Sequence, residues 1–150
     1  RNIWACSQKD INWEDRGFFK NNLEILCIWH GFYYGAHRAM SDVNATINLI
    51  SHENYRNNKP IIELIDNAKK LEYKIINKFP YDKEAVKLIK ERSKNYNYDG
   101  GNKTWSIVLS DQISLNNEKE WLSENIYKGE FKGIIKILSP YERYASNETA

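Results

Sequence analysis

The sequence is poor in cysteine, has no long apolar run and carries little excess of either charge, and each absence excludes a class of protein. The two cysteines form no Cys-x-x-Cys pair, which argues against a structural zinc site. The longest apolar run, residues 25–29, is far shorter than the roughly 20 residues that a membrane span needs. A formal net charge of +2 is too small to indicate a polyanionic partner by itself.

The sequence does contain enough apolar and aromatic residues for a folded core. Hydrophobic residues make up 41% of the 150 positions and aromatic residues 13%, which argues against disorder. A chain of this length forms one domain or two small modules. Cys27 follows Leu23 and Leu26 on a helical stripe, so we expect it to be a buried, reduced thiol in a cytoplasmic protein.

Apolar spacing and turn residues predict a mixed order of helices and strands. Helices are predicted at 23–30, at 39–51, from Pro60 onward, after Asp82 and at 115–127. Strands are predicted at 73–76, at 134–138, and in a hairpin of 96–98 with 103–109 around Asp99-Gly100-Gly101. Residues 52–59 are polar and rich in Asn, which is typical of a linker.

His37 and Asp42 stand at the start of the predicted helix 39–51. Val43, Ile47 and Ile50 recur at helical intervals and are predicted to lie against a core. Two residues five apart on a helix are turned by about 140° from each other. We therefore expect Asp42 to project from the helix and His37 to lie on the loop or first turn before it. A carboxylate for a divalent cation and an imidazole for a water proton could then meet at one point. The alternative is a surface histidine near a capping or solvated aspartate.

A series of motifs places this pair in a wider pattern. The motifs are Trp4-Ala5-Cys6-Ser7, Ile11-Asn12-Trp13, Gly17, Leu23-Glu24-Ile25-Leu26, Gly31-Phe32-Tyr33-Tyr34, His37-Arg38-Ala39 and Asp42. In this order they resemble the DnaQ-like 3′–5′ exonucleases of the DEDD superfamily, in the branch whose last motif is His-x4-Asp. The detailed resemblance covers residues 1–52. A weaker one continues into the carboxy-terminal extension of some bacterial members, through Tyr81-Asp82-Lys83, Gly100-Gly101-Asn102-Lys103-Thr104-Trp105, Trp121-Leu122 and Ile126-Tyr127.

The resemblance implies an α/β fold class and a division of the chain. Residues 1–52 would be the carboxy-terminal portion of a ribonuclease H-like exonuclease fold. Residues 53–78 are expected to be a linker with a helix and a possible strand. Residues 79–150 are expected to form a small α+β extension module.

The chemistry implied by the resemblance is two-metal hydrolysis of a phosphodiester with Mg²⁺ or Mn²⁺. On this interpretation Asp42 is a metal ligand and His37 is the general base, while His30 and His52 are surface or packing residues. The family uses four carboxylates, and only Asp42 has a counterpart here, because no Asp-x-Glu precedes it. We therefore expect an incomplete, inactive carboxy-terminal part of a longer exonuclease. The alternative is a remnant that kept the tail of the fold and lost the chemistry.

Three residues near the His/Asp pair are candidates for contacts with nucleic acid. Arg38 is a candidate phosphate contact, and the alternative is an ion pair with a neighbouring carboxylate. Tyr33 and Tyr34 are candidates for stacking on a base, since every base offers a π-face. The alternative for both tyrosines is packing of their loop.

The predicted hairpin offers a second candidate surface. Tyr96, Tyr98, Lys103 and Trp105 combine aromatic rings with a positive charge, as single-strand binding surfaces do. The alternative is that these rings form the core of a small domain. Tyr98, beside the turn, is the candidate base contact, and Trp105 is expected to be buried.

The expected function is therefore 3′–5′ exonucleolysis of DNA or RNA. The expected partners are a single-stranded 3′ end and a polymerase or another replication or repair protein, with no membrane. The rival hypothesis is a non-catalytic nucleic-acid-binding or adaptor module.

Overall fold

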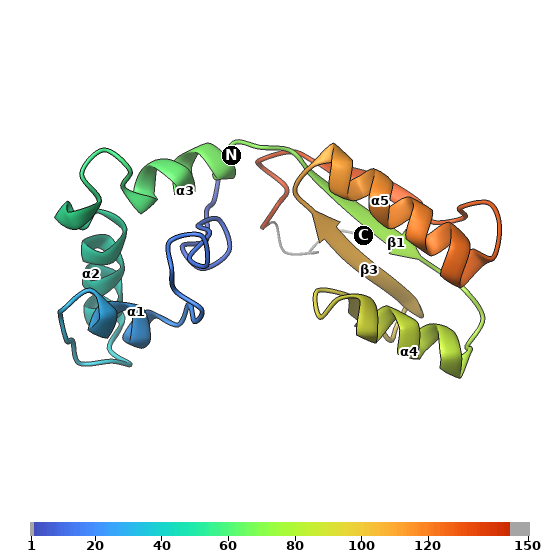
Figure 1. Cartoon of the computed structure of the whole chain (residues 1–150), viewed down its shortest axis with the longest axis horizontal. Helices are drawn as coiled ribbons and strands as arrows, with labels where there is room; N and C mark the ends of the chain where they lie inside the picture. Colours follow the sequence, from blue (N-terminus) through green and yellow to red (C-terminus); the bar gives the residue numbers. More distant parts are fainter. Residues whose placement is uncertain (1, 145–150) are drawn as a thin grey trace. The chain divides into compact units, whose positions relative to one another are not determined.

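The computed structural model describes residues 2–144 and divides the chain into two compact units, Arg1–Lys69 and Lys70–Ala150 (Figure 1). The described part of the first unit contains helices and no strand, whereas the second unit contains a four-stranded antiparallel sheet. The chain as a whole is therefore mixed α and β. Within residues 2–144, no helix has the length and apolar character that would carry it across a membrane.

The described part of the first unit contains three α-helices, as the sequence predicts, and a short 3₁₀ turn within the predicted linker 52–59. The elements are α1 (Leu23–Trp29), α2 (Ala39–Ile50), the turn Glu53–Tyr55 and α3 (Pro60–Ala68). Gly31 ends α1 with φ of +81°, a left-handed conformation that glycine adopts without steric cost. Pro60 opens α3 at the first helical position, where its missing N–H is not needed.

His30 lies inside the first unit, in an aromatic cluster with Trp13, Phe18, His52 and Tyr55. Its Nδ1 lies 2.6 Å from the carbonyl oxygen of Leu26. A carbonyl can only accept, so Nδ1 carries the hydrogen and Nε2 accepts from the Tyr55 hydroxyl. Burial lowers the pKa of His30, against the opposing effect of the bond to the Leu26 carbonyl. Of the two expectations for His30, a surface or a packing residue, the structure supports packing.

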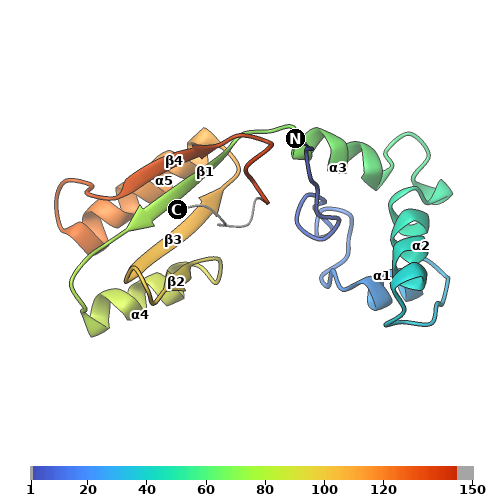
Figure 2. The same cartoon turned by 180° about the vertical axis from the view of Figure 1, so that it is seen from behind.

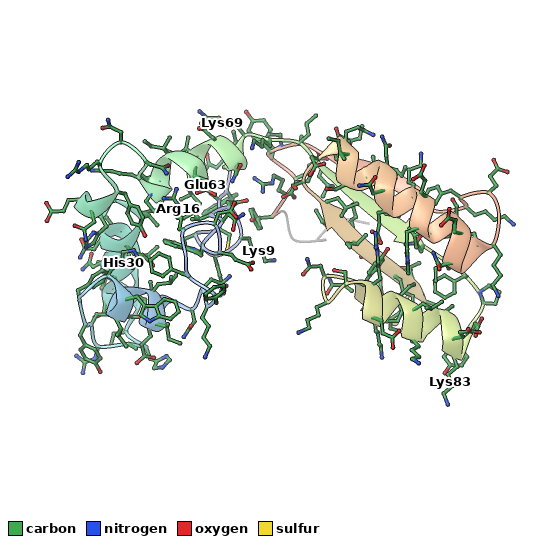
Figure 3. All side chains as sticks on the ribbon, viewed as in Figure 1. Lys9, Arg16, His30, Glu63, Lys69 and Lys83 are labelled. Atoms are coloured by element: carbon green, nitrogen blue, oxygen red, sulfur yellow. The ribbon has the colours of Figure 1, made fainter. Side chains whose placement is uncertain are left out.

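Arg16 and Glu63 fasten the loop before α1 to helix α3 (Figure 3). The Arg16 Nε and Nη2 atoms donate to Glu63 Oε2 at 3.0 and 2.7 Å, and Nη1 donates to the Asn58 carbonyl at 2.9 Å. The second Glu63 oxygen accepts from the Asn12 backbone N–H at 2.7 Å. Only 8% of the Arg16 side chain is exposed, so this is a largely desolvated ion pair with every charged end bonded.

Helix α2 does not bury the stripe that its sequence predicts. Val43 and Ile47 are 49% and 52% exposed, so the prediction that they lie against a core is wrong, while Ile50 is buried as expected. The buried face of α2 is instead formed by Ala45, Leu49 and Ile50. The helix carries apolar residues on more than one side, and the core of the first unit takes only one of these sides.

The second unit alternates strands and helices. Its elements are β1 (Glu72–Asn77), α4 (Lys83–Arg92), β2 (Asn97–Asp99), β3 (Thr104–Leu109), α5 (Gln112–Leu122), continued by a π turn over Ser123–Tyr127, and β4 (Ile134–Leu138). The strands lie in the order β2-β3-β1-β4, and all neighbours are antiparallel. The order βαββαβ with this sheet is the split βαβ arrangement.

Both helices of the second unit cover one face of its sheet. Figure 2 shows the four strands in front of α4 and α5, with the opposite face turned to the viewer. Side chains alternate between faces along a strand, so the buried Ile75 and Ile107, which are register partners, mark the face toward the helices. The residues expected to form a linker, 53–78, are divided by the fold, because α3 belongs to the first unit and β1 is an inner strand of the second.

A buried carboxylate joins α4, α5 and the segment before β2. Glu118 is 6% exposed and accepts from the Tyr96 hydroxyl at 2.6 Å and from Arg92 Nη2 at 3.1 Å. Burial and the neighbouring carboxylate raise the pKa of Tyr96 far above its ordinary value. Tyr96 is 7% exposed and part of the core, so of the two interpretations of this residue the structure supports burial.

Candidate functional site

Asp42 and His37 lie at the same end of α2 and do not touch. Asp42 is half-buried in the first turn of the helix. His37 is exposed in the preceding turn, with a left-handed φ of 65° that L residues adopt uncommonly. Among residues 2–144, no hydrogen bond or ion pair joins the two side chains. The imidazole therefore stands on the loop before the helix, where the spacing predicts it.

Tyr34 lies near the Asp42 carboxylate. Burial, followed by the negative charge of Asp42, raises the pKa of Tyr34. Tyr33, 79% exposed, and Tyr34 line a hollow of about 590 Å³ along α2. Other lining residues of this hollow are mainly polar: Ser41, Asn44, Asn48, Ser51, His52 and Glu53. The hollow is thus polar and adjoins the start of α2, but its lining does not include Asp42, His37 or Arg38.

Arg38 stands between His37 and the helix. It occupies the position just before α2 and is exposed, and its side chain makes no capping hydrogen bond. Its backbone carbonyl accepts from the Asp42 N–H at 2.9 Å, which fixes the first turn. Arg38 is therefore an exposed residue next to His37 in the chain, tied by its backbone to Asp42.

The residues present do not form a two-metal centre. Within the described chain, no three His, Cys, Asp or Glu side chains gather in a group that could hold a metal ion. A pair of divalent ions is normally held by several oxygen ligands, and among residues 2–144 the candidate site offers one carboxylate, Asp42. The described residues thus present fewer carboxylates here than the two-metal centre of the exonucleases that the sequence resembles.

Tyr98 belongs to a separate hollow in the second unit. It lies opposite Trp105 on the neighbouring strand, with their ring centroids 5.0 Å apart, and it is 55% exposed. Trp105 was predicted to be buried; it packs against the core but is only half-buried. The hollow has a volume of about 830 Å³ and is lined by Lys78, Phe79, Pro80, Tyr81, Val86, Lys90, Tyr98, Lys103 and Trp105.

Several residues of this hollow were missed by sequence reasoning. Tyr81 was used only for the weak resemblance, and Lys78 and Lys90 were not considered. Phe79-Pro80-Tyr81 could have signalled a rigid aromatic loop, because proline fixes the backbone between two rings. The lysines give no such signal, since only the fold brings the β1–α4 loop, α4 and the hairpin together.

Comparisons of the chain with family models, with curated proteins and with solved structures find no match.

Proposed function

We propose that this chain supplies the carboxy-terminal part of a 3′–5′ exonuclease active site. In this proposal the first unit is the carboxy-terminal portion of a ribonuclease H-like fold. The observation that carries it is the placement of His37 in an exposed left-handed turn directly before the helix that bears Asp42. An uncommon backbone conformation at a polar residue is found more often at functional sites than elsewhere. The motifs that resemble the family surround this pair on both sides.

The exposed apolar surface of the first unit supports an incomplete domain. Its exposed large residues include Trp4 at 64%, Phe19 at 85%, Trp29 at 48% and Met40 at 70%. Isolated exposed apolar residues are normal, but so many on one small unit are typical of a surface that packs against further protein. In the proposal, this surface packs against the remainder of the exonuclease fold.

The roles of the residues follow from their chemistry. Asp42 would be one of the oxygen ligands that a pair of Mg²⁺ or Mn²⁺ ions requires, and the other carboxylates must come from outside residues 2–144. His37 would accept the proton of the attacking water, since an imidazole titrates near neutrality. Arg38, Tyr33 and Tyr34 would contact the phosphate and base at the 3′ end. A polymerase or another replication or repair protein is the proposed partner.

The test compares two proteins on a 5′-labelled single strand with Mg²⁺ or Mn²⁺. The protein encoded by the whole reading frame should shorten the strand from its 3′ end, because it would contain the missing carboxylates. The 150-residue chain alone should release nothing above background. Digestion by the chain alone, or no digestion by the whole protein, would overturn the proposal.

Variants of the whole protein test the proposed roles of Asp42 and His37. Asp42→Ala should abolish digestion, and His37→Ala should lower turnover by roughly 10²–10⁴-fold through loss of the base. Asp66→Ala, on the exposed surface of α3, is the matched carboxylate control and should leave turnover unchanged. Near-normal turnover in the Asp42 or His37 variant removes that residue from the site.

A further inference from the structure

The hollow of the second unit combines an aromatic wall with positive charge. Tyr98 and Trp105 stand on adjacent strands and Tyr81 on the loop that leads into α4, while Lys78, Lys90 and Lys103 lie around them. The lining contains no carboxylate. None of the three lysines forms an ion pair within the described residues. Because no carboxylate of residues 70–144 is paired with these lysines, the hollow is complementary to an anionic ligand.

Packing does not account for the position of the Tyr81 ring. It is 85% exposed, and its ring makes no aromatic contact among residues 2–144. Tyr98 is 55% exposed, although Trp105 beside it packs into the core. Leaving large rings in water is unfavourable, and rings that line a hollow beside unpaired lysines are typical of surfaces on which bases stack.

The hollow continues around the edge strand β2 onto the uncovered face of the sheet. Tyr98 and Lys78 line both the hollow and a second depression of about 850 Å³ on that face. The second depression is lined by Lys74, Ile76, Lys78, Asn97, Tyr98, Asp99, Asn102, Thr104, Ser106, Val108 and Lys136. The two depressions are therefore neighbours, with Lys78 and Tyr98 between them and Lys74 and Lys136 on the open face.

The acidic groups on the open face are already bonded within the protein. The Asp99 carboxylate accepts from the side-chain and backbone N–H groups of Asn102 at 2.8 and 3.2 Å, and these bonds lower the pKa of Asp99. Glu72, on the same face, is paired with Arg143 at 2.6 Å. Glu72 is therefore neutralised by its ion pair, whereas Asp99 stays ionised and is the one carboxylate among the lysines Lys74, Lys78 and Lys136 that line the second depression.

The open face itself offers no ring for stacking. Its residues on the two inner strands are Glu72, Lys74 and Ile76 on β1 and Thr104, Ser106 and Val108 on β3. RNA-binding sheets of similar topology stack bases on aromatic side chains of the sheet itself. In this unit the aromatic residues lie on the helix side, at the edge, so a base must leave the face to stack.

We propose that the second unit binds single-stranded nucleic acid, with an unpaired base stacked on Tyr81 and Tyr98 in the hollow. The lysines Lys78, Lys90 and Lys103 hold the flanking phosphates, and the strand continues along the lysines of the open face. A duplex is excluded because its bases are already stacked and paired. This site is independent of Asp42 and His37, so it stands whether or not the chain is part of a nuclease.

The experiment measures fluorescence anisotropy of a short labelled single strand, as DNA and as RNA, titrated with the full chain. EDTA is present, so that no cleavage takes place. The single strand should bind, and an unlabelled duplex should compete poorly. Tyr81→Ala and Tyr98→Ala should each weaken binding by about 5- to 160-fold, the loss expected for one stacked base. Tyr141→Ala, an exposed tyrosine of the same unit that lines neither depression, is the aromatic control.

A pair of lysines on α4 supplies the charge control. Lys90 lines the hollow, whereas Lys87, on the same helix, pairs with Glu91 at 3.8 Å and lies outside it. Lys90→Ala should weaken binding and reduce the slope of log affinity against log salt by about 0.7, the value for one phosphate contact on a single strand. Lys87→Ala should change neither.

The absence of single-strand binding by the full chain would overturn the proposal. So would equal affinities of the wild type, Tyr81→Ala and Lys90→Ala, or a duplex that binds as well as the single strand. Thermal unfolding of each variant is measured in parallel. Tyr81 and Lys90 are exposed, so these two variants decide the result even if Tyr98→Ala is less stable.

Discussion

At the scale of single residues, His30 shows how a histidine can be held in one protonation state by its neighbours. Nδ1 donates to the Leu26 carbonyl, Nε2 accepts from Tyr55, and the rings of Trp13 and Phe18 lie at centroid distances of 6.2 and 4.8 Å. Adding a proton to Nε2 would remove the acceptor that Tyr55 uses and place a charge among aromatic rings. The neutral ring is therefore the form that the fold stabilises.

This arrangement predicts a pH dependence of stability. Burial lowers the pKa of His30 in the folded protein, so below about pH 6.5 the unfolded chain binds more protons at this site than the folded chain. The free energy of unfolding of the first unit should fall as the pH is lowered through this value. Chemical denaturation, followed by tryptophan fluorescence at several pH values, measures the slope. His30→Gln should flatten it, and an unchanged slope in this variant would contradict the assignment.

At the scale of elements, the ends of helices and strands followed from local signals in the sequence. Asp82 accepts from the Glu84 N–H at 2.9 Å at the start of α4, and β4 covers the predicted 134–138. Such signals act within a few residues, so they can be recognised in the sequence without knowledge of the fold. Which face of each element is buried could not be predicted from such local signals. Val43 and Ile47 have helical spacing but lie exposed, because burial depends on what packs against a helix.

The strand order of the second unit also could not be predicted from local sequence patterns. The strand at 73–76 was recognised, but its neighbours on both sides, β3 and β4, are distant in sequence. No local pattern indicates that β1 pairs with both strands, so the predicted strand was assigned to the linker 53–78. For the same reason Tyr98 was identified as a candidate, whereas Lys78 and Lys90 were not. The resemblance supplied His37 and Asp42, which spacing alone left open between a site and a surface pair.

Gly133, just before β4, tests the packing at this end of the sheet. A Cβ at this position would clash with the Phe131 ring and lie 2.8 Å from Asn77 Oδ1, and Asn77 is fully buried. Gly133→Ala should therefore lower the free energy of unfolding by about 1–3 kcal/mol, the usual cost of overpacking. Gly129→Ala is the matched control, since a Cβ there meets nothing within 4 Å. Denaturation curves in which both variants match the wild type would contradict this packing.

At the scale of the whole molecule, the two units differ in how their cores are built, although both leave large apolar side chains exposed. The second unit has a core of Ile75, Ile89, Tyr96, Ile107, Leu115 and Leu122 between a sheet and two helices. The first unit has a core of five residues, Ile11, Trp13, Leu26, Leu49 and Ile50, and leaves several large rings in water. A sheet with two helices on one face satisfies its own hydrogen bonds and buries one full layer, which is enough for a small domain to fold by itself.

This difference predicts how the parts of the chain behave when separated. Residues 70–150 alone should unfold cooperatively, because their core does not use the first unit. Residues 1–69 alone should bind anilinonaphthalene sulfonate strongly, through rings such as Trp4, Phe19 and Trp29. If the first unit is part of a larger exonuclease fold, the protein encoded by the whole reading frame should bind much less dye per molecule than the 150-residue chain. Equal dye binding by the two would show that the added residues leave this surface uncovered, and the first unit would then have to be considered a domain of its own.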